Sequence, residues 1–230
     1  MILIENLSVS YKKDSRIING LQLSLSECLI HAIVGLNGAG KTTLLNTIYG
    51  LKKQEEGKVL FNGSDLNKKS VSYLVSENFF YSNITAREYL SLFKNIHFDI
   101  EKWNALFKLP LDKLVDTYST GMKKKLAILG SLKQDKAIMI LDEPFNGLDI
   151  ETCRIIRSIL LKLKEKGKTI IITSHIIETL TNLCDHIHYL EYGKITHSCD
   201  KSEFQLFEEE LFKEIELKNE EALCELINDH

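Results

Sequence analysis

The fold is decided by Gly35-Leu36-Asn37-Gly38-Ala39-Gly40-Lys41-Thr42-Thr43, which follows the apolar run 29–34 and leads into the largely apolar residues 44–48. This stretch fits the pattern G-x-x-x-x-G-K-[ST] in the strand-to-helix context where it cradles phosphate groups. Its glycines let the backbone turn tightly and aim N–H groups at an anion facing a helix N-terminus. We expect Lys41 to reach the β- and γ-phosphates of a nucleotide and the Thr42 hydroxyl to ligate Mg²⁺.

Length and composition indicate one main domain. With 230 residues, 44% hydrophobic and 27% charged, the chain can bury a sizeable core and carry a smaller appended lobe. No apolar run approaches the roughly 18 residues of a membrane helix, and residues 1–6 do not begin a signal peptide. We therefore expect no direct membrane insertion. A net charge of −3 and a pI ≈ 6.2 give no electrostatic basis for binding nucleic acid.

The 5 cysteines are odd in number and scattered, which favours a reducing cytosol over a disulfide framework. Cys184, His186 and His188 are close enough to suggest a metal site. Alternate histidines on a strand are more typical of one solvated face, and no second ligand pair lies at zinc spacing. The run 123–125, three lysines, is interpreted as a solvated helix face.

In the N-terminal half, apolar residues alternate over 2–11 and 17–25, which predicts half-exposed, antiparallel strands. Further strands are expected over 58–63 and 71–75. The pattern then turns helical over 77–117, where Thr85-Ala86-Arg87-Glu88 forms a capping box and Asp99 caps a second helix. This segment is predicted to be a helical insertion between strands.

The C-terminal half returns to alternating strands and helices. The expected elements are a buried strand over 137–141, a helix ending near Gly167, a strand over 169–173, a helix over 176–184 and a hairpin over 186–197. From Asp200 the chain is acidic and helical in pattern. Its apolar residues are expected to pack one face of the tail on the rest of the molecule: Phe204, Phe207, Leu211, Phe212 and Ile215.

Two carboxylates, Asp142 and Glu143, directly follow the apolar residues 138–141. Ligands bind at the carboxyl ends of parallel strands. Downstream of a phosphate loop, Asp142 is therefore expected to hold Mg²⁺ through its water shell. Glu143 is placed to orient or deprotonate an attacking water.

Ser119 and Gly121 open a helix within Tyr118–Leu126 and can bind an anion through a hydroxyl and free N–H groups, although alone they would pass as an ordinary N-cap. The order of motifs is more specific. A phosphate loop, a helical insertion, the Ser-x-Gly helix and the Asp-Glu strand are followed by Asn146-Gly147-Leu148-Asp149 and Thr173-Ser174-His175. In this order the chain resembles the ATP-binding subunit of ABC transporters over most of its length.

The resemblance implies an α/β fold: a P-loop NTPase core on a mostly parallel sheet, with an N-terminal antiparallel β lobe and a helical insertion lobe. Residues 1–230 are then a single ATPase domain. Its core and β lobe would occupy roughly 1–76 and 135–200, its helical lobe with the signature roughly 77–134, and an acidic C-terminal tail roughly 200–230.

The stretch from Ser119 to Lys123 looks like the family's signature loop, in the S-x-G-M-K variant carried by an export-type subfamily. Ser119 and Gly121 would then cover the γ-phosphate of an ATP held by the other subunit of a head-to-tail dimer. Asp149 would belong to the loop that touches the partner's phosphate loop.

His175 is similar to the switch histidine that contacts the γ-phosphate and supports the glutamate and its water. Tyr11 would stack on adenine, although from the residues alone it can equally close a strand edge. The resemblance thus assigns catalysis to Glu143, His175 and Lys41, Mg²⁺ to Thr42 and Asp142, and ATP to Tyr11, Gly35, Asn37, Gly38, Ala39, Gly40, Lys41, Thr42, Thr43, Ser119, Gly121 and Asp149.

Two positions depart from the family pattern. Ser76 stands where a glutamine usually begins the helical insertion and reaches both Mg²⁺ and the membrane partner, and Phe145 stands where threonine is common. Shortly after Ser76, the aromatic residues 79–81 either form part of the insertion's core or dock a permease helix, because three consecutive aromatics cannot all face inward.

The expected function is ATP hydrolysis that powers a separately encoded membrane permease, by a homodimer or heterodimer of ATPase subunits, in the cytoplasm at the inner face of the cell membrane. The alternative is a soluble ABC ATPase such as an iron–sulfur cluster assembly scaffold ATPase. Chromosome-organising ATPase heads would need long coiled-coil arms, and translation factors would need a second cassette in the same chain. A GTPase would need Asn-Lys-x-Asp, which Asn67-Lys68-Lys69-Ser70 does not supply.

Overall fold

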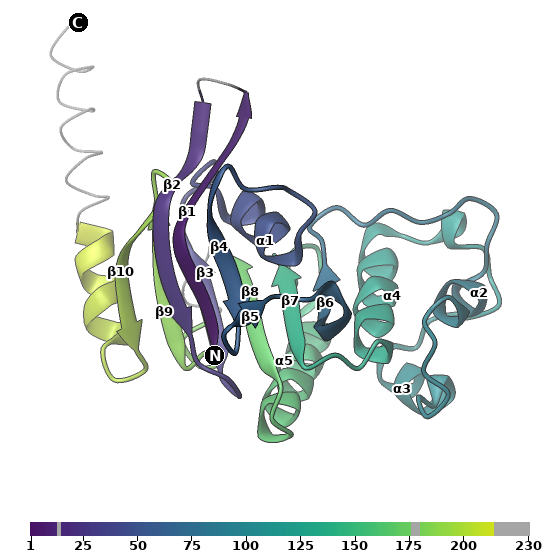
Figure 1. Ribbon diagram of the computed structural model, residues 1–230. Coiled ribbons are helices and arrows are strands. Elements are labelled where there is room, and N and C mark those ends of the chain that lie inside the picture. The colour runs from purple at the N-terminus through teal and green to yellow at the C-terminus, as the bar shows by residue number, and fades with distance from the viewer. Residues whose placement is uncertain (13–14, 176–179, 214–230) are drawn as a thin grey trace, which may run out of the picture.

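The computed structural model describes residues 1–12, 15–175 and 180–213 (Figure 1). In chain order, the elements are β1 (Ile2–Lys12), β2 (Ser15–Leu25), β3 (Ile30–Val34), α1 (Lys41–Tyr49), β4 (Glu56–Phe61), β5 (Ser64–Asp65), the 3-10 helix η1 (Lys68–Ser70), β6 (Val71–Leu74), α2 (Ala86–Ser91), α3 (Ile100–Phe107), the 3-10 helix η2 (Val115–Thr117), α4 (Thr120–Lys133), β7 (Ile138–Asp142), α5 (Ile150–Glu165), β8 (Thr169–Ser174), β9 (His186–Glu191) and β10 (Lys194–Asp200). A further helix covers 204–213.

Two sheets form the frame of the molecule, and together with the helices they confirm the predicted α/β class. A 4-stranded sheet has the order β2-β1-β4-β5, with antiparallel pairing throughout. A 6-stranded sheet has the order β10-β9-β3-β8-β7-β6, in which only the edge strand β10 runs antiparallel to its neighbour. Every residue of β3, β7 and β8 is buried, as expected for parallel strands covered on both faces.

Apolar side chains pack on both faces of the 6-stranded sheet. One face packs against α1 and the 4-stranded sheet, with Leu44 and Ile4 among the buried residues. The other packs against α4, α5 and the helix 204–213, with Leu126, Ile159 and Phe207 among the buried residues. The parallel strands are thereby packed on both faces, and the candidate site lies at their carboxyl ends.

The helical insertion extends beyond the β6 edge of the sheet, where Figure 1 shows α2, α3 and α4 side by side. The predicted capping box is present, since the Thr85 side chain accepts from the Glu88 N–H and the Glu88 carboxylate accepts from the Thr85 N–H. Asp99 caps α3, as predicted. Arg87 joins these helices, because its guanidinium pairs with Glu101 of α3 and also with Asp112, at 2.7 Å in each case.

The C-terminal half departs in two places from the expected helices. The predicted helix over 176–184 falls partly on 176–179, outside the described residues. Its remainder is a turn rather than a helix, in which the Leu180 carbonyl accepts from the Leu183 and Cys184 N–H groups. The helix 204–213 buries Phe204, Phe207 and Leu211 as predicted, whereas Phe212 is exposed. Ile215 lies outside the described residues.

The histidines of β9 do not share a solvated face, so that expectation was wrong for His188. Its ring is buried and lies 3.2 Å from the Nδ1 of His31, a buried residue of β3. Cys184 is buried in the same core cluster as residues of α5 and the helix 204–213. Among residues 1–12, 15–175 and 180–213, no helix has the length and hydropathy needed to cross a membrane.

Candidate functional site

The phosphate loop joins β3 to α1 and surrounds a hollow of about 320 Å³. Gly38 and Gly40 adopt φ angles of 84° and 106°, the left-handed region that glycine enters without steric cost. No side chain caps α1, which begins at Lys41, so its first backbone N–H groups are available to an anion. The hollow is lined by Ile17, Asn37, Gly38, Gly40, Lys41, Thr42, Thr43, Asp142 and Glu143.

Lys41 is buried beneath the loop, where its ammonium donates to the carbonyls of Gly35 at 2.7 Å and Leu36 at 3.2 Å. Burial lowers the pKa of Lys41, and the nearby carboxylates of Glu143 and Asp142 oppose that shift. An ammonium has three donors, so one N–H is left to reach into the hollow. Lys41 is therefore placed to neutralise charge on a phosphate.

Asp142 ends β7 and is fully buried. One of its carboxylate oxygens accepts from the Thr42 hydroxyl at 2.8 Å and the other from the Thr173 hydroxyl at 2.6 Å. Mg²⁺ prefers such oxygen ligands and keeps several waters of its own. The hydroxyl and carboxylate at this point therefore fit a magnesium ion.

Glu143 directly follows β7 and has a φ of 49°, which is uncommon for a residue with a side chain. Its N–H donates to the Thr173 hydroxyl at 3.0 Å, and its Oε1 lies 3.1 Å from the His175 Nδ1. Unusual backbone conformations of this kind cluster at functional sites, where the surrounding structure holds them. The carboxylate is thus fixed at the edge of the phosphate-loop hollow, with His175 as its partner.

Ser119, Gly121 and Asp149 do not line this hollow. Ser119 caps α4 by accepting from the Met122 N–H at 3.3 Å. Asp149 caps α5, and its hydrogen bonds with Thr152 lower the pKa of its carboxyl group. These three predicted site residues are therefore not brought to the phosphate-loop hollow of their own chain.

Tyr11, at the end of β1, is 56% exposed and also does not line the hollow. The Lys52 ammonium lies 4.4 Å from the centre of its ring. Ile17 of β2 does line the hollow, and no motif had singled it out. Thr173 was likewise missed as a site residue, although a polar residue at the end of an apolar strand was a signal that could have identified it.

The lysine run at the start of α4 is not a solvated face, which corrects the expectation from sequence. Lys124 is only 7% exposed, and its ammonium lies 3.5 Å from the Asp142 carbonyl. Lys125 pairs with Asp149 at 3.1 Å. The first turns of α4 are therefore attached to the segment that carries the two carboxylates.

The three aromatics after Ser76 have different environments. Phe79 is 82% exposed and Tyr81 is also exposed, whereas the Phe80 ring packs 4.9 Å from the Tyr89 ring. Phe80 thus belongs to the core of the helical insertion, whereas Phe79 and Tyr81 lie on the surface, where a partner could contact them. Ser76 itself lines a second hollow behind Glu143 rather than the phosphate-loop hollow.

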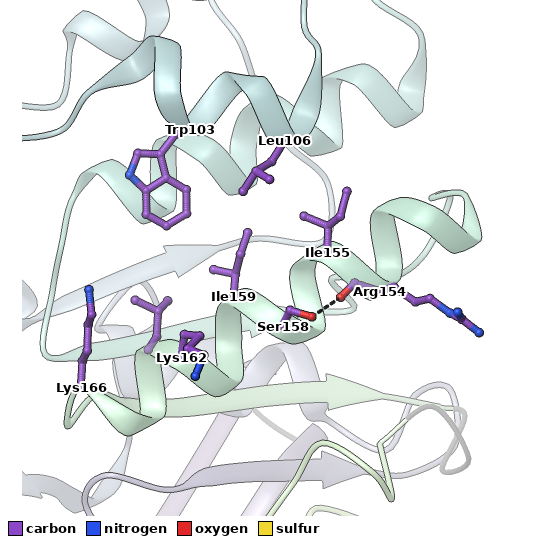
Figure 2. A pocket seen from close by; sticks show the side chains of 9 residues that line it. Trp103, Leu106, Arg154, Ile155, Ser158, Ile159, Lys162 and Lys166 are labelled. Atoms are coloured by element: carbon purple, nitrogen blue, oxygen red, sulfur yellow. Dashed lines mark hydrogen bonds between the residues drawn. The ribbon is translucent and has the colours of Figure 1, made fainter.

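An apolar groove of about 440 Å³ lies between α3 and α5 (Figure 2). Trp103 and Leu106 of α3 face Ile155 and Ile159 of α5 across it, as Figure 2 shows. None of the residues predicted for the site lines this groove. It is therefore separate from the phosphate chemistry.

Comparison with known proteins supports the resemblance to ATP-binding subunits of ABC transporters that the order of motifs indicated. The profile of the family described as ABC transporter matches residues 18–146. An uncharacterized ABC transporter ATP-binding protein of Methanocaldococcus jannaschii is 32% identical over 206 residues, which cover 85% of this chain and 76% of that protein. The lantibiotic transport ATP-binding protein SrtF of Streptococcus pyogenes is 31% identical over 204 residues, which cover 85% of this chain and 89% of that protein.

A solved structure described as the ATP binding subunit of an ABC transporter has a similar fold. It aligns with a TM-score of 0.81 and 25% sequence identity, over 87% of this chain and 90% of that chain. The two sheets and the attached helices therefore have a close counterpart among experimental structures.

Proposed function

Because the chain belongs to the ABC transporter family, whose profile spans more than half of it, we propose that it hydrolyses ATP to power a separately encoded membrane permease. It is an ATP-binding subunit of this family. The observation that carries the proposal is the position of Glu143, held by His175 at 3.1 Å and lining the same hollow as the phosphate loop. A carboxylate at this place can orient a water and accept its proton.

The other residues of the hollow have complementary roles in this proposal. The backbone N–H groups at the start of α1 and the Lys41 ammonium bind the phosphates and offset their charge. Thr42 and Asp142 would hold Mg²⁺, which supplies further positive charge to the phosphates. His175 fixes the orientation of the Glu143 carboxylate and contacts the terminal phosphate. Tyr11 would stack on adenine after the Lys52 ammonium moves off its ring.

Ser119, Gly121 and Asp149 are proposed to act on the ATP of a second ATPase subunit. Their separation from the phosphate loop of their own chain supports this arrangement. In a head-to-tail dimer, each nucleotide would be enclosed by the phosphate loop of one chain and the signature residues of the other. The dimer is proposed to contain either two copies of this chain or this chain and a related one.

The subunit is proposed to lie in the cytoplasm at the inner face of the cell membrane, bound to its permease. We assign it to export systems on the G-M-K signature, and the lantibiotic transport named for the streptococcal relative is consistent with that assignment. The transport names of the relatives favour this function over an iron–sulfur scaffold ATPase. Residues 1–76 and 135–200 would form the ATP-binding core and β lobe, and 77–134 the helical lobe.

Glu143→Gln tests the proposal directly. The variant should bind ATP nearly as well as the wild type but hydrolyse it more slowly by about tenfold or more, because only the water-orienting carboxylate is lost. Steady-state phosphate production and nucleotide binding would be measured in parallel. Glu165→Gln, which changes an exposed glutamate of α5, serves as the matched control. Near-normal turnover by Glu143→Gln would show that this carboxylate is not catalytic.

A further inference from the structure

A second hollow, of about 470 Å³, lies behind Glu143. Three segments line it: the loop after β6, the start of α4 and the loop after β7. Its lining residues are Ser76, Glu77, Asn78, Thr120, Lys123, Lys124, Glu143, Asn146 and Gly147. Glu143 lines this hollow and the phosphate-loop hollow as well, so the two share one wall.

Lys124 is the unusual residue of this second hollow. Among the described residues, three lysines are less than 9% exposed: Lys41, Lys124 and Lys133. Lys41 donates to two carbonyls, the nearer at 2.7 Å, and Lys133 donates to the Asn95 carbonyl at 3.1 Å. Lys124 has a single long contact, 3.5 Å from the Asp142 carbonyl. Burial lowers the pKa of Lys124, and the nearby carboxylates of Asp142 and Glu143 oppose that shift. Because an ammonium has three N–H donors, donors beyond the one at the Asp142 carbonyl are left for an anion in the hollow.

The remaining lining residues suit an oxyanion of modest affinity. The side chains of Asn78, Asn146 and Thr120 carry hydrogen-bond donors, and Lys123 adds a second cation. The carboxylates of Glu77 and Glu143 balance the two lysines. A site with this charge balance would hold an anion briefly and release it, as a product site must.

We propose that this second hollow receives inorganic phosphate, the product of ATP hydrolysis, with Lys124 as its principal ligand. The inference rests on the proposed ATPase function, because hydrolysis at the phosphate loop is what supplies the phosphate. The product forms beside Lys41 and Glu143, on one side of the shared wall. It then passes Glu143 to Lys124 and leaves between the loop after β6 and the start of α4, without retracing the path by which ATP entered.

The test measures phosphate binding while the phosphate loop is occupied. Wild-type protein is saturated with Mg²⁺ and a non-hydrolysable ATP analogue, and radiolabelled inorganic phosphate is added in equilibrium dialysis. Wild type should bind one phosphate per chain, and Lys124→Met should bind it more weakly by about tenfold or more, the worth of a hydrogen bond to a charged group. Lys124→Arg, which keeps the cation, should retain most of the affinity.

Lys133→Met is the matched control, because Lys133 is equally buried on the same helix and does not line the second hollow. It should bind phosphate like the wild type, and thermal unfolding would show whether the two methionine variants lose comparable stability. Lys124→Gln replaces Lys124→Met if the latter does not fold. In steady-state assays, added phosphate should inhibit the wild type without competing with ATP, and Lys124→Met should lose this inhibition.

Equal phosphate affinity in wild type and Lys124→Met would overturn the inference. So would phosphate binding that the ATP analogue abolishes, because the phosphate would then occupy the phosphate loop itself. Failure of the wild type to bind the analogue or to hydrolyse ATP would instead refute the proposed function. The two failures are therefore distinguishable in the same set of proteins.

Discussion

Acidification should destabilise this protein through a buried chain of hydrogen-bonded histidines. The Ser26 carbonyl can only accept, so the His31 Nε2, at 2.9 Å, must carry a proton. In a neutral ring the His31 Nδ1 is then the acceptor, and the His188 Nε2, at 3.2 Å, donates to it. The His188 Nδ1 in turn accepts from the Ser198 hydroxyl at 2.9 Å. Both rings are neutral in this arrangement, and a second proton on either one would place a positive charge in a site almost closed to solvent.

The direction of the pH effect follows from the two pKa values. Burial lowers the pKa of His31 from 6.5 to about 4, opposed by the Ser26 carbonyl and Asp185, while the nearby His186 adds to the lowering. Burial also lowers the pKa of His188 to about 3, and the other two histidines add to that shift. Between about pH 6.5 and 4, the unfolded chain therefore binds more protons than the folded one. The free energy of unfolding must fall as the pH falls through this window.

The expected loss of unfolding free energy on acidification is large for a single domain. Each histidine contributes about 1.4 kcal/mol per pH unit within the window, so at pH 5 each has cost roughly 2 kcal/mol relative to pH 8. Together they remove about 4 kcal/mol, a substantial part of the 5–15 kcal/mol typical of a folded protein. Both side chains are buried, so solvent does not screen this effect appreciably.

Urea unfolding at several pH values between 8 and 5 measures the effect. Wild type is compared with His188→Gln, which removes one titrating ring, and with His97→Gln, which removes an exposed one. The pH-dependent loss should shrink by about half in His188→Gln and stay unchanged in His97→Gln. Parallel pH curves for wild type and His188→Gln would refute the reasoning, because the buried chain would then contribute nothing to the titration.

Three further outcomes are expected. A Lys41→Ala chain mixed with a Ser119→Arg chain, each inactive alone, should regain some ATP hydrolysis through one composite site; no recovery at any ratio would contradict the shared site. Phe79→Asp should abolish co-purification with a membrane permease while basal ATPase activity persists. Ile96→Asp, which changes an even more exposed apolar residue, is the control; unchanged co-purification of Phe79→Asp would place the docking surface elsewhere. Ser76→Gln should raise Mg²⁺ affinity or turnover, because the longer side chain can reach the metal. Identical Mg²⁺ dependence in the wild type and the variant would show that the serine does not affect metal binding.

Local sequence was sufficient to predict the elements that carry the phosphate chemistry. β7 and β8 are short apolar strands, each of which ends in polar residues. Their parallel register pairs Asp142 with Thr173, so both carboxyl ends lie on the same edge of the sheet. The positions of Asp142, Glu143 and His175 near the phosphate loop therefore follow from strand order alone. The partner-facing roles of Ser119 and Asp149 do not, because they depend on a second chain.

The buried histidines were misjudged because the alternation rule considers only one strand. His31 and His188 are 157 positions apart in sequence, and in the fold their buried rings contact each other. A polar residue enters a core when a partner satisfies its hydrogen bonds, and that partner lies on another strand. No pattern within β9 could therefore distinguish a solvated histidine from one paired across the sheet.

The lysines at 123–125 were also misjudged from local sequence, but in their case helix geometry could have corrected the prediction. Consecutive residues of an α-helix lie about 100° apart around its axis, so three in a row cannot share one narrow solvated face. α4 contacts β6, α2 and α3, and most of its residues are buried. At least one of the three lysines must then enter the interior, and Lys124 does so beside Asp142 and Glu143. Where a charged run is longer than the exposed arc of its helix, the residue forced inward is a candidate functional residue rather than part of a solvated face.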